Sequence, residues 1–377
     1  MVGLLIGALA ATLAVGVFGW FDEVFEDPSL SDEAISVIEE NYFRVPDPER
    51  LGQDSVSGMV EELRRRYDDR FSHYFDPKTL EDFEAQTSGQ FQGVGLGVIE
   101  AKDGLRVTQV YQDTPAEAAG IDVGDVIVAA DGEALRDLSA EAAAAKIKGE
   151  PGTSVMLQVR PRGTAQVRDV EVERAEVRIP AVRGELKRVG GRAVGYLQLA
   201  TFSEGAHGEL RAETERLYRR GAEGLVLDLR GNGGGLLNEA VLTSSVFVED
   251  GLIVATEGRS TGRQEYDASG DALEPKPMAV LVDENTASAA EILTAALADY
   301  GLADVIGTRT YGKGTFQEVI QLENGGALDL TVGEYLTSED ISLAGKGIEP
   351  DIEVEFESET PVDEPLRRAL DEVAGQL

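Results

Sequence analysis

The distribution of apolar residues divides the chain into stretches of different character, and the first stretch is apolar throughout. Residues 1–21 carry no charged side chain, and the run ends at Asp22 and Glu23. About 20 such residues are enough to cross roughly 30 Å of hydrocarbon. No Lys or Arg precedes the run, and it is longer than the apolar segment of a usual secretory signal. We therefore predict a membrane anchor over residues 1–21, with a cleaved signal or a buried helix as the alternatives.

The next stretch, residues 22–88, has apolar positions at helical spacing. A helix is expected to start at Ser31, a capping residue followed by two acidic residues. Further helices are predicted over 56–67 and 78–84. Pro46 and Pro48 are expected to break the pattern between the first two helices. The region is typical of a helical packing module.

Residues 89–178 change to short alternating runs separated by turn signals such as Asp103-Gly104 and Asp131-Gly132. The predicted strands are Leu105–Val110, Val126–Ala130 and Val155–Val159, and the predicted helices are Pro115–Ala119 and Ser139–Ile147. This pattern indicates a small β-rich domain.

Residues 179–355 alternate buried strands with helices, which is typical of an α/β domain. The predicted strands are Val194–Leu199, Leu225–Leu229, Met278–Val282, Val305–Ile306 and Phe316–Leu322, the last of which should continue the same sheet; the predicted helices are Gly208–Arg220 and Ser288–Tyr300. Residues 356–377 read as an acidic tail with a short helix near Pro365–Val373. The chain as a whole is predicted to be a multidomain α/β protein.

Composition and charge narrow the function classes. The chain has 377 residues, of which 42% are hydrophobic, so it can fill the cores of two or three domains. With 34 basic and 70 acidic residues, the net charge of −36 disfavours nucleic-acid binding and adhesion to anionic lipid. There is no cysteine, so disulfides, thiolate metal sites and cysteine nucleophiles are excluded. The two histidines, His73 and His207, cannot form a three-histidine metal site, and we expect no metal or cofactor.

Ser288 is the first candidate for chemistry. The segment Ser288-Ala-Ala-Glu291 fits a capping box at the start of a helix, which is a purely structural role. A serine at a helix start is also suited to be a nucleophile, because the free N–H groups and the helix dipole stabilise an oxyanion. The amide of Ala289 would be the first oxyanion donor.

A nucleophilic serine needs a base, and Lys313 is the better candidate. His207 precedes a charged helix and reads as a surface residue. Lys313 is flanked by Gly312 and Gly314, which would let the backbone approach closely and place the ammonium in a dry space. Desolvation lowers the pKa of a lysine, so that its neutral amine can act as a general base. Gln317 would lie on the same face of an extended segment and could hold the amine.

The glycine-rich loop after the strand Leu225–Leu229 is the third candidate. Its glycines can make a tight turn, or the N–H of Gly233 or Gly234 can supply a second oxyanion donor. A phosphate loop is the competing interpretation, since Gly307 to Lys313 fits G-x-x-x-x-G-K. Gly314 stands where such a loop needs Ser or Thr, and the residues that follow alternate like a strand. Nucleotide binding is therefore rejected.

The β-rich domain at 89–178 resembles a PDZ domain of the circularly permuted type found in bacterial proteases. The similarity lies in Ala119-Gly120-Ile121 and Gly124-Asp125-Val126-Ile127. Such a domain adds a peptide as an extra strand, and its glycine-rich backbone receives the terminal carboxylate. The resemblance assigns peptide binding to Val94, Gly95, Leu96, Gly97 and Val98.

From about Leu30 to Pro365 the chain resembles the carboxyl-terminal processing proteases, a family of serine–lysine peptidases. The motifs that carry the resemblance are Asp228-Leu-Arg-Gly-Asn-Gly-Gly-Gly235, Thr286-Ala-Ser288-Ala, Gly312-Lys-Gly314 with Gln317, and Gly345-Lys-Gly-Ile-Glu-Pro-Asp351. The resemblance implies that Ser288 is the nucleophile, Lys313 the base and Gln317 the support of the lysine. Ala290 stands where the family often has a second serine, and we expect activity to survive this departure.

These observations predict a serine endopeptidase that binds substrates by their C-terminal tails and cleaves them outside the cytoplasm. The expected organisation is an anchor over 1–21, a helical region over 22–88, a PDZ-like domain over 89–178, a peptidase core over 179–355 and a tail over 356–377. Expected partners are protein or peptide substrates with accessible C-termini, the membrane and, as an open possibility, further copies of the chain. The rival hypothesis is a non-catalytic peptide-binding scaffold, which would not need both Ser288 and Lys313.

Overall fold

The computed structural model describes residues 30–357 and 362–377. It divides into two compact units, which are described separately below. Among the described residues the first unit comprises 30–76 and 319–330, and the second comprises 77–318 and 331–377. Within the described ranges no helix has the length and apolar character needed to cross a membrane. The predicted anchor, residues 1–21, lies outside these ranges.

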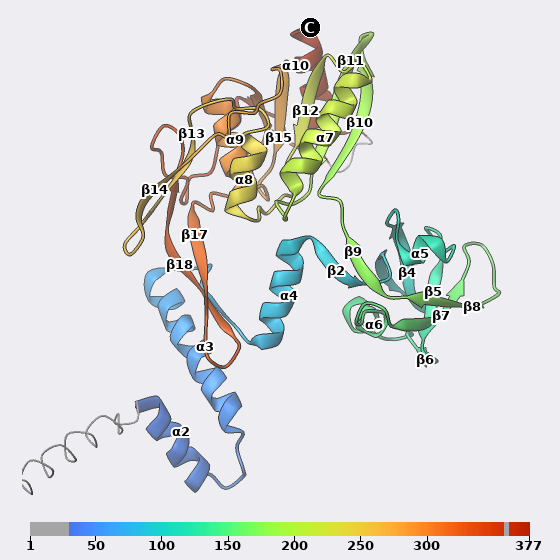
Figure 1. Ribbon diagram of the computed structural model, residues 1–377, viewed down its shortest axis with the longest axis vertical. Coiled ribbons are helices and arrows are strands. Elements are labelled where there is room, and N and C mark those ends of the chain that lie inside the picture. The colour runs from blue at the N-terminus through green and yellow to red at the C-terminus, as the bar shows by residue number, and fades with distance from the viewer. Residues whose placement is uncertain (1–29, 358–361) are drawn as a thin grey trace, which may run out of the picture. The chain divides into compact units, whose positions relative to one another are not determined.

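The first unit is mainly helical, as expected. It contains α2 (Leu30–Asn41), α3 (Pro48–Tyr67) and β1 (His73–Phe75), which pairs with residues 327–329 of β18 (Figure 1). The expectation that Pro48 separates the helices is wrong in detail. Pro48 occupies the first turn of α3 behind the N-cap Asp47, where its missing N–H costs nothing.

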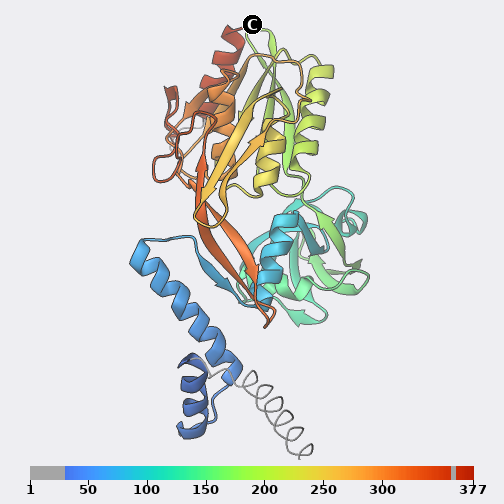
Figure 2. The ribbon, with the colours of Figure 1, turned by 60° about the vertical axis from the view of Figure 1, so that its left-hand side comes forward.

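The PDZ-like domain in the second unit is an antiparallel sheet with two helices (Figure 2). Its strands are β3 (Leu96–Ala101), β4 (Gly104–Val110), β5 (Val126–Ala130), β7 (Ser154–Arg160) and β8 (Arg168–Glu173), in that order, with β6 (Glu133–Ala134) beside β5 and with helices α5 (Pro115–Ala118) and α6 (Ala140–Ile147). Leu105, Ile127 and Leu157 are fully buried in its core. Because β3 ends the order, one of its edges is unpaired within the domain.

The chain enters and leaves this domain through two adjacent strands. Helix α4 (Pro77–Ser88) leads into β2 (Gln90–Gly93), which pairs antiparallel with β9 (Ala175–Arg178). The amide of Ile179 donates to the carbonyl oxygen of Gly89 at 3.1 Å, so the two connections run side by side.

The rest of the second unit is built on a mostly parallel sheet, as the alternating pattern predicted. Its strands, in order, are β10 (Val182–Val189), β11 (Arg192–Leu199), β12 (Gly224–Asp228), β15 (Met278–Val282), β16 (Asp304–Gly307) and β19 (Ile352–Glu353). Helices α7 (Ala206–Arg219), α8 (Leu237–Ser244) and α9 (Ala289–Asp299) cover one face, and α10 (Glu364–Gly375) covers the other. The C-terminal helix is therefore part of this core, since Ala369 and Val373 are fully buried against Val226 and Leu281.

A second sheet contains β13 (Leu252–Gly258), β14 (Gly262–Asp267), β17 (Thr315–Gln321) and β18 (Ala327–Leu336). The prediction that Phe316–Leu322 continues the parallel sheet is wrong. Strand β17 instead forms a hairpin with β18, because the intervening Asn324-Gly325-Gly326 supplies a tight turn. Residues 333–336 of β18 pair with β13.

Candidate active site

Two loops at the carboxyl ends of neighbouring parallel strands carry the candidate residues. Strands β12 and β15 pair in parallel, with Asp228 opposite Leu281. The loop after β12 contains Gly231 and the three glycines 233–235, and the loop after β15 leads to Ser288. In open α/β sheets this edge is where ligands bind. The sheet therefore brings together two of the three segments that the sequence singled out.

Ser288 immediately precedes α9 and has a strained backbone. Its φ of 57° and ψ of −119° are unusual for a residue with a side chain, and its exposed fraction is 7%. Such strain costs on the order of 1–3 kcal/mol and persists where the surroundings impose it, as in sharp turns that present a nucleophile. The conformation favours a functional role for Ser288 over a capping role alone.

The Glu291 carboxylate joins the Ser288 turn to the Lys313 segment. Glu291 is completely buried and accepts four hydrogen bonds. One oxygen accepts from the hydroxyl of Thr310 at 2.5 Å and the amide of Gly312 at 2.8 Å. The other accepts from the amides of Ser288 and Lys313, both at 2.9 Å. Because one oxygen binds both amides, the backbone nitrogens of Ser288 and Lys313 lie within about 6 Å of each other.

The glycines around Lys313 permit the close approach that the sequence indicated. Gly312 has a φ of 82°, and a Cβ there would lie 2.8 Å from the amide nitrogen of Gly347. A Cβ at Gly314 would collide with the backbone of Ala344. The Gly345-Lys-Gly347 motif thus packs directly against Gly312, and the two residues before it pack against Gly314. The Lys313 side chain between these glycines is half-buried.

Gln317 lies in β17, on the same strand face as Thr315. Its side-chain amide donates to the hydroxyl of Thr331 at 3.3 Å and, more weakly, to that of Thr315 at 3.4 Å. These bonds fix the Gln317 side chain on a half-buried surface of the β17–β18 hairpin, within the same unit as Lys313.

Of the predicted oxyanion donors, Gly234 and Ala289 lie directly against the Ser288 backbone, and Gly233 precedes Gly234 in the same loop. A Cβ at Gly234 would lie 2.8 Å from the Ser288 Cβ and 3.0 Å from the Ala289 nitrogen, so these backbones touch. The Gly234 amide already donates to the side-chain oxygen of Asn232 at 2.9 Å. Among the described residues, no acceptor faces the amides of Gly233 and Ala289. Both amides are therefore available to a ligand.

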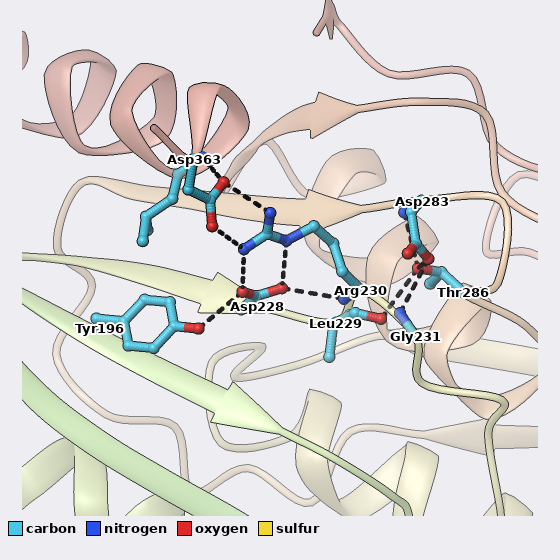
Figure 3. Close-up of polar contacts among 9 residues, drawn as sticks. Tyr196, Asp228, Leu229, Arg230, Gly231, Asp283, Thr286 and Asp363 are labelled. Atoms are coloured by element: carbon cyan, nitrogen blue, oxygen red, sulfur yellow. Dashed lines mark hydrogen bonds and ion pairs between the residues drawn. The ribbon is translucent and has the colours of Figure 1, made fainter. Parts of the chain in front are cut away.

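A network of ion pairs holds the start of the same loop (Figure 3). The guanidinium of Arg230 donates two hydrogen bonds to Asp228 and two to Asp363. The Tyr196 hydroxyl donates to Asp228 at 2.8 Å, and burial and the Asp228 charge both raise the pKa of Tyr196. Burial alone would raise the pKa of Asp363, but hydrogen bonds from Arg230 and the Leu366 amide lower it below its ordinary value. Both carboxylates thus accept hydrogen bonds from one guanidinium.

Tyr335 is a further polar residue at Ser288 that sequence reasoning missed. It is 6% exposed, and its amide donates to the Gly314 carbonyl oxygen at 2.7 Å. Burial raises the pKa of Tyr335 well above its ordinary value, and hydrogen bonding with Ser288 opposes that rise in part. Tyr335 is therefore a neutral phenol beside the Ser288 hydroxyl. Strand β18 was not predicted, so no sequence signal placed this residue at the site.

His207, the alternative base, makes a different contact. Its Nδ1 lies 2.8 Å from a carboxylate oxygen of Glu239. Its side chain is 40% exposed at the start of α7. Among the described residues there is no group of three or more His, Asp or Glu side chains arranged to hold a metal ion.

The residues expected to bind peptide border a groove between β3 and α6. The groove has a volume of about 50 Å³, and its lining is apolar apart from one cation and one glycine: Phe91, Gly93, Val94, Leu96, Val98, Ala144, Ile147 and Lys148. Gly95 has a φ of 89°, and a Cβ there would collide with Thr114. Gly97 pairs with Gln109 across the β3–β4 hairpin. The groove therefore lies beside the unpaired edge of β3, where an extended peptide can add.

Comparison with known proteins points to one family. The model of peptidase family S41 matches residues 193–354, and a PDZ domain model matches residues 106–161. The carboxy-terminal processing protease CtpA of Bacillus subtilis is 33% identical over 327 residues, which are 86% of this chain and 68% of that protein. A carboxy-terminal-processing protease of Bartonella bacilliformis is 35% identical over 324 residues, 84% and 73% of the two chains. The solved structure of a photosystem II D1 C-terminal processing protease is 28% identical over 90% of each chain, with a TM-score of 0.52.

Proposed function

The chain belongs to peptidase family S41 and is a carboxy-terminal processing serine protease with a PDZ domain, and from this premise we propose that it cleaves with Ser288 and Lys313. The observation that carries the proposal is the Glu291 carboxylate, which binds the backbone amides of both residues through one oxygen. Two residues 25 positions apart in sequence are thereby fixed in one small volume. Such fixed geometry is what a nucleophile and its base require.

In the proposed reaction the neutral amine of Lys313 takes the proton from the Ser288 hydroxyl as its oxygen attacks the substrate carbonyl. The amides of Ala289 and Gly233 then donate to the oxyanion of the tetrahedral intermediate. Collapse of the intermediate releases the amine product, which receives the proton from Lys313, and leaves an ester on Ser288. Water, deprotonated by Lys313, then attacks the ester carbonyl; the bond to the Ser288 oxygen breaks, the acid product leaves, and the proton returns from Lys313 to Ser288. In this proposal Gln317 supports the Lys313 amine, and the Tyr335 phenol forms a hydrogen bond with the Ser288 hydroxyl.

The structure also does not favour the rival hypothesis of a non-catalytic scaffold. A peptide-binding scaffold needs the groove at β3 but not a serine held at a φ of 57°. It also does not need two unpaired amides beside that serine. The direct test is to incubate the protein with an unfolded polypeptide and to separate the products by mass spectrometry. New C-termini with the wild type, and none with Ser288→Ala, are the expected result.

The PDZ domain is proposed to receive the C-terminal tail of the substrate. Support comes from the unpaired edge of β3 and from the apolar lining of the groove. In addition, the backbone amides of Val94 and Gly95 donate to no acceptor among the described residues. Peptide in the groove could open the catalytic site or could only hold the substrate nearby. The paired connections at Gly89 and Ile179 are well placed to transmit a movement, which favours the first mechanism.

We therefore expect a short apolar peptide with a free C-terminus to stimulate cleavage of a small reporter that cannot reach the groove. The stimulation should be roughly 5- to 150-fold, the range that ordinary coupling energies allow. Gly95→Ala should abolish it, because the new Cβ would collide with Thr114 and the residue has a positive φ. Initial rates of reporter cleavage measure the effect.

Gly152→Ala is the matched control for this experiment. Gly152 has a φ of 83° in the same domain, and a Cβ there would meet nothing within 4 Å. The control variant should keep its response to the peptide. If the peptide leaves the wild-type reporter rate unchanged and competes with protein substrates, the domain only docks the tail.

We also propose that the enzyme is anchored in a membrane with its catalytic part outside the cytoplasm. The support is the charge-free apolar run over residues 1–21. The full chain should sediment with membranes, and deletion of residues 1–21 should release an active enzyme. A mature protein whose N-terminus is found near Asp22 would instead show a cleaved signal.

A further inference from the structure

We propose that Arg230, through its ion pair with Asp363, is a positioning residue for the loop that carries the oxyanion donor Gly233. The inference rests on the proposed function of that loop. Arg230 does not face the substrate in this role. It acts by tying the beginning of the loop to the C-terminal helix α10, an element about 130 residues further along the chain.

The Arg230 guanidinium is bound by one carboxylate on each of two sides. The Arg230 guanidinium donates to Asp228 at 3.0 and 2.7 Å and to Asp363 at 2.8 and 2.9 Å (Figure 3). Asp363 is also the N-cap of α10, and it accepts from the amide of Leu366 at 3.0 Å. Bidentate guanidinium–carboxylate pairs fix orientation as well as distance. The guanidinium therefore sets the direction in which the chain leaves β12.

The remainder of the loop is fastened to the Ser288 side. The amide of Gly231 donates to Asp283 at 2.9 Å, and the Thr286 hydroxyl donates to the Leu229 carbonyl oxygen at 2.9 Å. The Asn232 carbonyl oxygen accepts from the amide of Ala287 at 3.0 Å. The loop is thus bound to α10 through Arg230, and its backbone is bound to the nucleophile turn by three hydrogen bonds. A shift at Arg230 would move Gly233 relative to Ser288.

The position of the loop depends on the planar guanidinium of Arg230, because this group binds two carboxylates at once. Asp228 has a side chain that is only 3% exposed, and Asp363 faces it across the same guanidinium. Lysine at position 230 would keep the charge but lose the fork, whereas asparagine at position 363 would keep the shape but lose the ion pair. Both variants avoid leaving Asp228 without a cation, which would threaten folding.

The experiment compares Arg230→Lys and Asp363→Asn with the full-length wild type in detergent solution. We expect kcat to fall by about 10- to 100-fold, less than the complete loss of an oxyanion donor would cause, with KM unchanged. Affinity for a peptide boronate, which forms a tetrahedral adduct with the serine, should fall by the same factor. Melting temperatures should stay close to that of the wild type.

Arg192→Lys is the matched control. Arg192 pairs with Glu223 at 3.0 Å at the opposite end of the same sheet, and this variant should keep the wild-type kcat and boronate affinity.

Wild-type kcat and boronate affinity in both Arg230→Lys and Asp363→Asn would overturn the proposal. A fall in kcat that follows only the melting temperature, without loss of boronate affinity, would also overturn it, since a purely structural role predicts that result. Failure of the proposed function would look different. In that case the wild type itself would neither cleave nor bind the boronate through Ser288.

Discussion

Alanine at Ser288 or at Lys313 should each lower peptide cleavage by on the order of 10³-fold or more, and the double variant should lose no more than either single variant. The reason is that the two side chains act as one unit, since a serine without its base is a poor nucleophile and a base without its serine has no task. The kcat for a peptide substrate, measured from initial rates, tests this expectation. Chelators should have no effect on the rate.

Lys313→Arg should fail as completely as Lys313→Ala. A guanidinium is not deprotonated in proteins, so it cannot accept the proton from Ser288. This variant separates a general base from a residue that only supplies positive charge. If Lys313→Arg retained substantial activity, the positive charge and not the proton transfer would be the contribution of residue 313.

The chain contains a close control for Lys313. Lys346 lies in the same Gly-Lys-Gly pattern, and its motif packs against Gly312, but its side chain is exposed. Lys346→Ala should therefore keep most of the activity. Full activity in Lys313→Ala would contradict the mechanism and direct attention to His207, which already contacts Glu239 at 2.8 Å.

The elements that the sequence predicted well are those whose signal is local. The buried strands β12 and β15 are continuous apolar runs, and the cap residue and acids at Ser31 mark a helix that the structure places at Leu30–Asn41. Ser288, Lys313 and the glycine loop were proposed as site residues because each lies in a short motif, in which residue types stand at fixed spacing.

What the sequence did not reveal depends on pairing between distant segments. Strand β17 was assigned to the parallel sheet because its alternation shows a strand but not its partner, and the pairing with β18 is decided by tertiary structure. Tyr335 and Asp363 were missed for the same reason. Each reaches the site from a segment whose local pattern carries no sign of the residue it contacts. Glu291 was noted only as a cap, although its hydrogen bonds extend to residues 310–313.

Glu291→Gln should destabilise the protein and nearly abolish its activity at the same time. The carboxylate accepts four hydrogen bonds in a fully buried position, whereas a glutamine side chain offers one acceptor oxygen and a donor amide. At least two of the four donors lose their acceptor. Each buried donor left unpaired costs about 1–3 kcal/mol, so the free energy of unfolding should fall by roughly 2–6 kcal/mol. Thermal unfolding reports the loss of stability, and kcat, measured well below the unfolding transition, reports the loss of activity.

Glu209→Gln is the matched control, because it makes the same chemical change at another carboxylate that accepts backbone amides. The Glu209 carboxylate also accepts backbone amides, those of Ala181 and Val182 at 2.7 and 3.2 Å, but through a single oxygen and away from Ser288. Glutamine can keep that oxygen in place, so this variant should lose little stability and no activity. Glu291→Gln differs because its two oxygens serve two segments, and whichever oxygen becomes an amide releases either the Gly312 amide or the shared contact of Ser288 and Lys313. A stable and fully active Glu291→Gln would show that the nucleophile and its base hold their positions without this carboxylate.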